Sequence, residues 1–126
     1  MTRPPVNPMV LPNFAEMLWA GAAKHGDAPA IIERERTTTH RQLMERAAAV
    51  ASTLVARGLQ PEQRVGILLD RGADAAATFF GIAAAGGIAI NINETLRPRQ
   101  VEYVLEHSDA SFLITSADVL GRQPRE

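Results

Sequence analysis

Apolar and polar residues alternate in blocks along residues 64–93, and the block lengths predict a strand–helix–strand unit. The short apolar run Val65–Leu69 has the length of a buried strand. After a polar break, Ala73–Ala85 is apolar and rich in small residues, which suits a helix packed on most of its sides. Gly86 and Gly87 stop this helix, and Ile88–Ile92 has the pattern of a second buried strand. Such a βαβ unit has parallel strands joined by a right-handed crossover.

The spacing of apolar residues before this unit predicts two helices and a β-hairpin. Apolar residues at helical spacing predict a helix over Phe14–His25, with Asn13 in the N-cap position. Ala30–Glu33 and Thr37–Thr39 flank a polar turn, and this pattern predicts a small β-hairpin. Thr39 is placed to cap a second long helix with an apolar stripe on one face.

The segment after the unit predicts the remaining elements. A helix is expected to begin near Pro98, followed by a buried strand over Ser111–Thr115 and a final helical turn at residues 116–118. The predicted fold is therefore α/β: an N-terminal helix and a β-hairpin, followed by a three-strand parallel βαβαβ unit. The expected parallel strands lie near residues 64–69, 88–92 and 112–115.

Composition and charge restrict the class of protein and its partners. The chain has 126 residues, of which 46% are apolar and 21% charged, as in an ordinary globular domain. The net charge of −1 gives no electrostatic reason to expect nucleic acid or an anionic membrane surface as a partner. The absence of cysteine excludes disulfides and thiolate chemistry. No stretch has the roughly 18 apolar residues of a membrane span, and no secretory signal is recognised, so we expect a cytoplasmic protein.

Polar residues that follow the two predicted parallel strands are the best candidates for a site. Asp70 and Asp74 come after the first strand, at the end where open α/β sheets bind ligands. Asp74 also suits a purely structural role beside a helix N-terminus. Asn91 and Asn93 end the second strand, where amide side chains commonly cap the turn before a helix.

Other chemically active residues fit structural roles. His25, His40 and His107 are far apart and lack the spacing of metal ligands. Gly86-Gly87 follows a helix, whereas a phosphate-binding glycine loop precedes one. The serines lie in no nucleophile motif. We therefore assign no catalytic, cofactor-binding or metal-binding residue.

The order of several short segments resembles the start of the AMP-forming acyl-CoA synthetase and adenylation-domain superfamily. An early helix is followed by segments similar to family motifs, namely GDAPAII (Gly26–Ile32), TTHRQL (Thr38–Leu43), RGLQPEQRVGILL (Arg57–Leu69), FFGIAAAGGIAININETLRP (Phe79–Pro98) and VEYVLEHSDASFLITS (Val101–Ser116). Departures include His40 in place of the usual tyrosine and Glu62-Gln63 in place of Gly-Asp. Asn91 and Glu94 stand where proline is usual, and Asn93 matches acyl-CoA ligases better than peptide synthetases.

The resemblance implies a two-step reaction and also which parts of the enzyme this sequence lacks. In the family a carboxylate attacks the α-phosphate of ATP, and a thiol such as CoA then displaces AMP. Phosphate is held by a Ser/Thr/Gly-rich loop that ends in lysine, and acidic residues hold Mg²⁺ and the ribose. These motifs lie downstream of the segment that this sequence resembles, so no family catalytic residue matches a position in residues 1–126.

Composition and the resemblance together divide the chain into three parts and leave several interpretations open. Residues 1–12 predict an extended arm, 13–120 a partial N-terminal subdomain of an AMP-forming ligase, and 121–126 a polar tail. The chain is expected to be inactive alone, as a truncated or split ligase. Three alternatives remain: a part of a peptide-synthetase adenylation domain, a free-standing α/β protein-interaction module, or a small nucleotide-binding protein. The missing phosphate loop counts against the nucleotide-binding protein.

The incomplete sheet predicts an association partner. A sheet that ends early exposes unpaired N–H and C=O groups, and helix Ala73–Ala85 is expected to leave one apolar face uncovered. We expect either a downstream chain that completes the enzyme or self-association.

Overall fold

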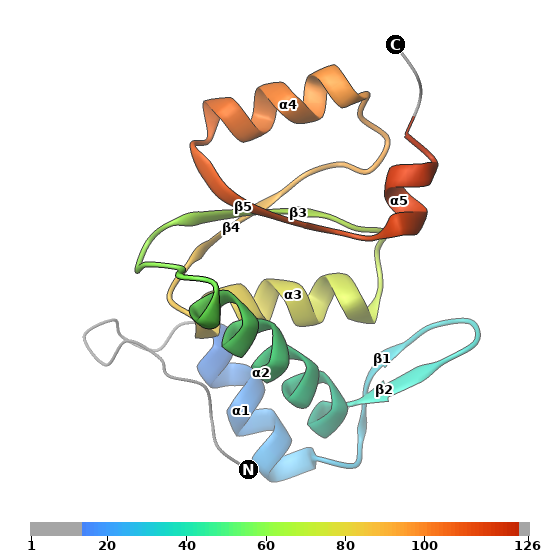
Figure 1. The fold of residues 1–126 in the computed structure, drawn as a ribbon. Helices are drawn as coiled ribbons and strands as arrows, with labels where there is room; N and C mark the ends of the chain where they lie inside the picture. The colour runs from blue at the N-terminus through green and yellow to red at the C-terminus, as the bar shows by residue number, and fades with distance from the viewer. Residues whose placement is uncertain (1–13, 124–126) are drawn as a thin grey trace.

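A parallel three-stranded sheet with helices on both faces forms the centre of the fold (Figure 1). The computed structural model describes residues 14–123. The predicted arm at 1–12, the expected cap Asn13 and residues 124–126 of the predicted tail lie outside the described residues. The predicted α/β class, with an N-terminal helix, a β-hairpin and a three-strand parallel unit, is confirmed.

The boundaries of the helices and strands lie close to the predicted ones. In chain order the described elements are α1 (Phe14–His25), β1 (Pro29–Ile32), β2 (Thr37–Thr39), α2 (His40–Ala56), β3 (Arg64–Leu68), α3 (Ala73–Ala84), β4 (Ile88–Asn91), α4 (Pro98–His107), β5 (Ala110–Thr115) and α5 (Ala117–Gly121). The final helix includes Gly121, the first residue of the predicted tail.

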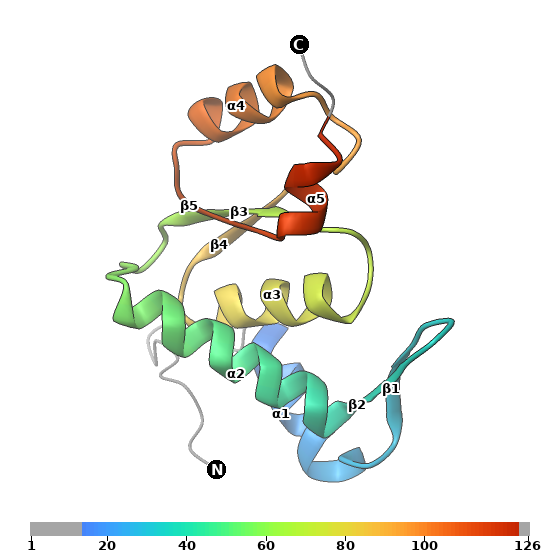
Figure 2. The same ribbon diagram turned by 45° about the vertical axis from the view of Figure 1, so that its right-hand side comes forward.

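Strand β3 lies at the centre of the sheet, and the strand order is β4-β3-β5. Both of its neighbours run parallel to it, with Val65 opposite Ala89 of β4 and Phe112 of β5. The connecting helix α3 lies against one face of the sheet and α4 against the other (Figure 1, Figure 2). The predicted parallel pairing of β3 with β4 is confirmed, whereas the central position of β3 was not predicted.

Helix α3 is enclosed between the sheet and a second layer of helices. Its side chain Ile82 packs with Val65 and Leu54 in a cluster between β3 and α2. Helices α1 and α2 cover the opposite side, and Asp74 is the one exposed residue among the twelve of α3. The expectation that α3 leaves an apolar face uncovered is therefore wrong, because the preceding helices fold back over it.

Local capping signals take the predicted form. The backbone N–H of Gln42 donates to the hydroxyl of Thr39 at 3.1 Å, and the N–H of Thr39 donates to the side chain of Gln42 at 2.9 Å. This reciprocal pair is the capping box predicted for α2. After α3, Gly86 has a φ of +87°, a left-handed conformation that glycine adopts without steric cost.

Candidate functional site

Two hollows lie side by side at the carboxyl ends of the parallel strands. The first hollow, of about 250 Å³, lies between the β1–β2 hairpin, the start of α3 and the start of α5. The second hollow, of about 380 Å³, lies at the ends of β3 and β4 and includes Asn91 and Asn93. Leu69 and Arg71 border both hollows. This edge is where the sequence placed its candidate residues.

The two candidate aspartates lie at the first hollow and are paired with arginines. Asp70 accepts a hydrogen bond from Arg122, which follows α5. Asp74 lies in the first turn of α3, 3.4 Å from a guanidinium nitrogen of Arg46 and 3.9 Å from one of Arg36. Both carboxylates are exposed, so these pairs connect neighbouring elements with only a small gain in stability.

Glu33 is the residue of this edge that sequence reasoning missed. One of its carboxylate oxygens accepts a hydrogen bond of 2.6 Å from the backbone N–H of Ala73, at the start of α3. The N-cap residue of α3 is Gly72, which has no side chain, so the hairpin supplies the acceptor instead. The glycine at the N-cap was the one available signal, because it has no side chain that could accept a hydrogen bond from the first turn of α3.

The same hydrogen bond perturbs the titration of Glu33. The N–H of Ala73 holds the pKa of the Glu33 carboxyl below its ordinary value of 4.5, and the charge of Arg36 lowers this pKa further. A carboxyl whose pKa is lower in the folded than in the unfolded chain stabilises the fold above its unfolded pKa. This contribution is lost as the pH falls below 4.5 through the folded-state pKa.

We expect Glu33→Gln to lower the thermal midpoint at neutral pH, because the amide removes the negative charge at the start of α3. The difference from the wild type should shrink as the pH falls below 4.5, where Glu33 itself becomes protonated. Thermal unfolding followed by circular dichroism between pH 3 and 7 measures this. Glu35→Gln, in the exposed hairpin turn, is the matched control and should change little. Equal effects of the two substitutions on the thermal midpoint would contradict the role of Glu33 as the cap of α3.

Asn93 has the turn-capping role that the sequence suggested. Its side-chain oxygen accepts hydrogen bonds from the backbone N–H of Thr95 at 2.9 Å and from the Thr95 hydroxyl at 2.7 Å. These bonds shape the turn that leads into α4. Asn91 ends β4 and is exposed in the second hollow, and within residues 14–123 its side chain has no hydrogen bond.

The histidines occupy structural positions. His25 and His107 lie in the last turns of α1 and α4, as predicted, where a cationic side chain suits the helix dipole. His40 begins α2, and its Nδ1 is 2.9 Å from the carbonyl oxygen of Ala28. Among the described residues no group of three or more His, Cys, Asp or Glu side chains could hold a metal ion. Over the same residues, every helix is too short or too polar for a membrane span.

The side chains at the carboxyl-end edge thus mainly hold neighbouring elements together, and we call this set of contacts the frame. Its acidic groups are held by arginines or by the start of α3, and these contacts join the hairpin and α2 to α3, and the end of β3 to the segment after α5. In doubly wound sheets this edge carries the ligand-binding loops. The fold and this edge together define the class: part of an α/β domain with an open parallel sheet, whose polar residues gather at the carboxyl ends of the strands.

Comparison with known proteins agrees with this class. Residues 18–126 match the family described as AMP-binding enzyme, and the chain belongs to this family. Phosphinothricin tripeptide synthetase PhsC of Streptomyces viridochromogenes is 35% identical over 101 residues, which are 80% of this chain and 9% of PhsC.

Two solved structures show the same arrangement of elements. A benzoate CoA ligase from Burkholderia xenovorans LB400 matches with a TM-score of 0.81 and 31% identity over 88% of this chain and 23% of the ligase. The N-terminal domain of FACL13 from Mycobacterium tuberculosis matches with a TM-score of 0.79 and 27% identity over 86% of this chain and 29% of that domain chain. The chain therefore spans less than a third of each of these relatives.

Proposed function

We propose that this chain is the N-terminal structural part of an ATP-dependent, AMP-forming acyl-CoA ligase. The observation that carries the proposal is the match to a benzoate CoA ligase over 88% of this chain at 31% identity. In the proposed reaction a carboxylate is activated as an acyl-adenylate and then transferred to the thiol of CoA. These substrates are cytoplasmic metabolites, so we propose a cytoplasmic location.

We further propose that residues 1–126 do not form the adenylate by themselves. Attack on the α-phosphate requires donors that neutralise the charge developing on the phosphate oxygens, which glycine-rich loops and lysine supply in many enzymes. The sequence contains no Ser/Thr/Gly-rich run ending in lysine. The part played by this chain is to hold the sheet and the loops at its carboxyl end, on which the rest of the domain is built.

A peptide-synthetase adenylation domain is the second candidate, and the similarity to PhsC favours it. Both candidates activate a carboxylate with ATP, and they differ in the acceptor thiol and in the acid. Asn93 supports the ligase, since the resemblance places aspartate there in peptide synthetases. The frame described above is compatible with either reaction.

Carboxylate-dependent ATP–pyrophosphate exchange tests the proposal. The isolated chain should show no exchange above background with benzoate or with amino acids. Two chimeras, in which this chain replaces the matched N-terminal part of the benzoate CoA ligase or of a PhsC adenylation domain, should recover exchange, and the ligase chimera should recover more. Exchange by the isolated chain would contradict the proposal. Greater recovery in the PhsC chimera would favour the second candidate.

A further inference from the structure

The second hollow, at the carboxyl ends of β3 and β4, combines one cationic and one anionic side chain with an apolar lining. Its volume of about 380 Å³ lies in the range of ordinary small-molecule pockets, roughly 300–1,000 Å³. Arg71 lines it from the segment after β3, and Glu94 lines it from the segment after β4. Two separate segments of the chain therefore bring opposite charges to one hollow.

These two charges are outside the frame. Within residues 14–123 the guanidinium of Arg71 and the carboxylate of Glu94 form no hydrogen bond and no ion pair, with each other or with another side chain. Glu94 is half-buried, and a carboxylate withdrawn from water without a partner is costly. Arg122 lies near enough for the charge of Glu94 to act on it, but the hydrogen bond to Asp70 is the main cause of the raised pKa of its guanidinium. Arg122 therefore already has a partner.

Two amide side chains add hydrogen-bonding groups to the same hollow. The side chain of Asn91 has no hydrogen bond within the described residues, so its donors and its acceptor are both available. Asn93 uses its oxygen to hold the turn at Thr95, and over the same residues its N–H₂ group has no acceptor. The hollow therefore offers donors to a carboxylate at Arg71 and the amides, and an acceptor to an ammonium group at Glu94.

The remaining residues that line the hollow are apolar. Ile67 and Ile92 are buried, and Leu69 and Ala75 are half-buried. A ligand that covers these side chains with an apolar group of its own removes apolar surface from water and gains affinity.

The frame holds the segment that carries Arg71. Asp70, directly before it, accepts a hydrogen bond from Arg122, and the backbone N–H of Ala73, two residues after it, donates to Glu33. A binding group on a segment that is already held in place loses less conformational freedom when a ligand binds. The contacts of the frame thus prepare the hollow for a ligand.

The balance of charge favours a zwitterion over a phosphate group. Arg71 and Glu94 make the second hollow neutral, and the neighbouring first hollow is lined by more carboxylates than arginines. A multiply charged anion at this edge would be repelled by these carboxylates. A ligand with one charge of each sign pairs both side chains and leaves no charge of its own unpaired.

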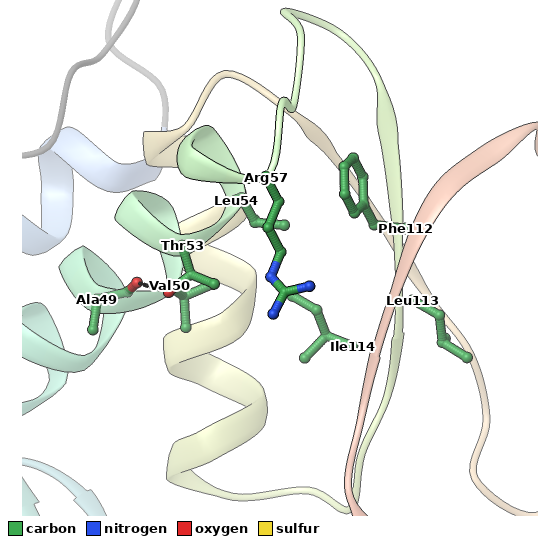
Figure 3. A pocket seen from close by; sticks show the side chains of 8 residues that line it. All are labelled: Ala49, Val50, Thr53, Leu54, Arg57, Phe112, Leu113 and Ile114. Carbon is green, nitrogen blue, oxygen red and sulfur yellow. Dashed lines mark hydrogen bonds between the residues drawn. The ribbon is translucent and has the colours of Figure 1, made fainter.

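An apolar groove between α2 and β5 is similar in volume, about 400 Å³, but differs in its chemistry (Figure 3). Arg57 is the one charged residue among the eight that line it, and Figure 3 shows its guanidinium group extending toward Ile114. The lining contains no acidic side chain, so it does not identify the chemistry of an occupant. The second hollow, in contrast, does so through its paired charges.

We propose that the second hollow is a binding site for an α-amino acid with an apolar side chain. Arg71 and Asn91 donate hydrogen bonds to the carboxylate of the ligand, and Glu94 accepts them from its ammonium group. The apolar side chain of the ligand covers the apolar lining. The inference goes beyond the proposed function, which assigns no ligand to this hollow, and it involves no chemical step.

Titration of residues 1–126 with L-leucine, followed by amide NMR spectra, tests the proposal. Saturable shifts should be confined to amides in residues 67–71 and 91–94. Isocaproate is leucine without the ammonium group, and isoamylamine is leucine without the carboxylate. Each should bind at least about 10-fold more weakly than leucine, because a hydrogen bond to a charged group contributes about this factor or more. Absence of saturable shifts with leucine, or equal affinity for the three compounds, would overturn the proposal.

Arg71→Gln and Glu94→Gln separate the two contacts. Neither substitution removes a side-chain contact of the fold, because both side chains are unpaired in the described residues. Arg71→Gln should weaken leucine binding about 10-fold or more and leave isoamylamine binding unchanged. Glu94→Gln should weaken leucine binding to a similar extent and leave isocaproate binding unchanged.

Arg64→Gln is the matched control, because Arg64 is exposed at the amino end of β3, away from the hollow. It should bind leucine as the wild type does. Equal weakening of leucine binding by Arg64→Gln and Arg71→Gln would contradict the position of the site.

Inorganic phosphate tests the competing anion site. Tighter binding of phosphate than of leucine at the same amides would overturn the proposal. These measurements use no ATP, whereas pyrophosphate exchange in the chimeras tests the proposed function. Leucine binding with inactive chimeras would therefore reject the proposed function and retain the amino-acid site, and active chimeras without leucine binding would do the reverse.

Discussion

Ile82→Ala should lower the free energy of unfolding by about 2–5 kcal/mol, the usual cost of truncating a fully buried isoleucine. Ile82 is 0% exposed and packs between α3, β3 and α2, with Val65 and Leu54 among its neighbours. The alanine leaves a cavity in the layer that joins the sheet to the helices. For a chain whose total stability is of order 5–15 kcal/mol, such a loss is a large fraction.

Urea unfolding measures this effect, followed by circular dichroism and by fluorescence of Trp19, the single tryptophan. The matched control is Ile32→Ala at the end of β1, because the side chain of Ile32 is 76% exposed. The control should change the free energy of unfolding by less than about 0.5 kcal/mol. A comparable loss at both positions would show that the layer between β3 and α2 is not the main core.

Gly81→Ala should destabilise the fold by about 1–3 kcal/mol through overpacking. Helices α2 and α3 cross at this residue, and a Cβ at Gly81 would lie 2.6 Å from Cβ of Val50 and 2.8 Å from the carbonyl oxygen of Ala47. The second of these atoms belongs to the backbone, so relief requires the two helices to move apart. The substitution should also raise helix propensity, which offsets at most about 1 kcal/mol of the cost.

Gly121→Ala separates the steric effect from the helix propensity. Gly121 ends α5, and a Cβ placed there meets no atom within 4 Å. This variant should be neutral or more stable by up to about 1 kcal/mol. Urea midpoints of both variants against the wild type test the prediction. A stabilised Gly81→Ala variant would mean that α2 and α3 separate without cost.

The ligase chimera shows how Ile82→Ala and Gly81→Ala are expected to affect a full-length enzyme of this family. Ile82 and Gly81 both lie in α3, Ile82 in the cluster with β3 and Gly81 against α2, and the carboxyl ends of β3 and β4 carry the candidate site. In the ligase chimera, a loss of exchange from Ile82→Ala should therefore accompany a loss of folding and should not appear as a separate catalytic defect.

The sequence alone was sufficient to predict the helices, strands and caps that depend on residues close together in the chain. Periodicity placed α1 and the three parallel strands within about two residues, because apolar spacing is a property of neighbouring positions. The capping box of Thr39 and the glycine stop at Gly86 were predictable for the same reason. Asn93 was predicted as a turn cap, since its partner Thr95 is two residues away.

Features that depend on distant contacts were decided only in the tertiary structure. Glu33 caps α3 from 40 residues away in the chain, and no local pattern identifies a pair at that separation. The central position of β3 depends on the connection through α4, which places β5 on the side of β3 opposite β4. The covering of α3 depends on how α1 and α2 fold back, and therefore the open apolar surface lies beside β5 and not on α3. The hydrophobic effect is non-directional. The sequence therefore indicates which apolar faces must be buried, and the tertiary packing determines which elements cover them.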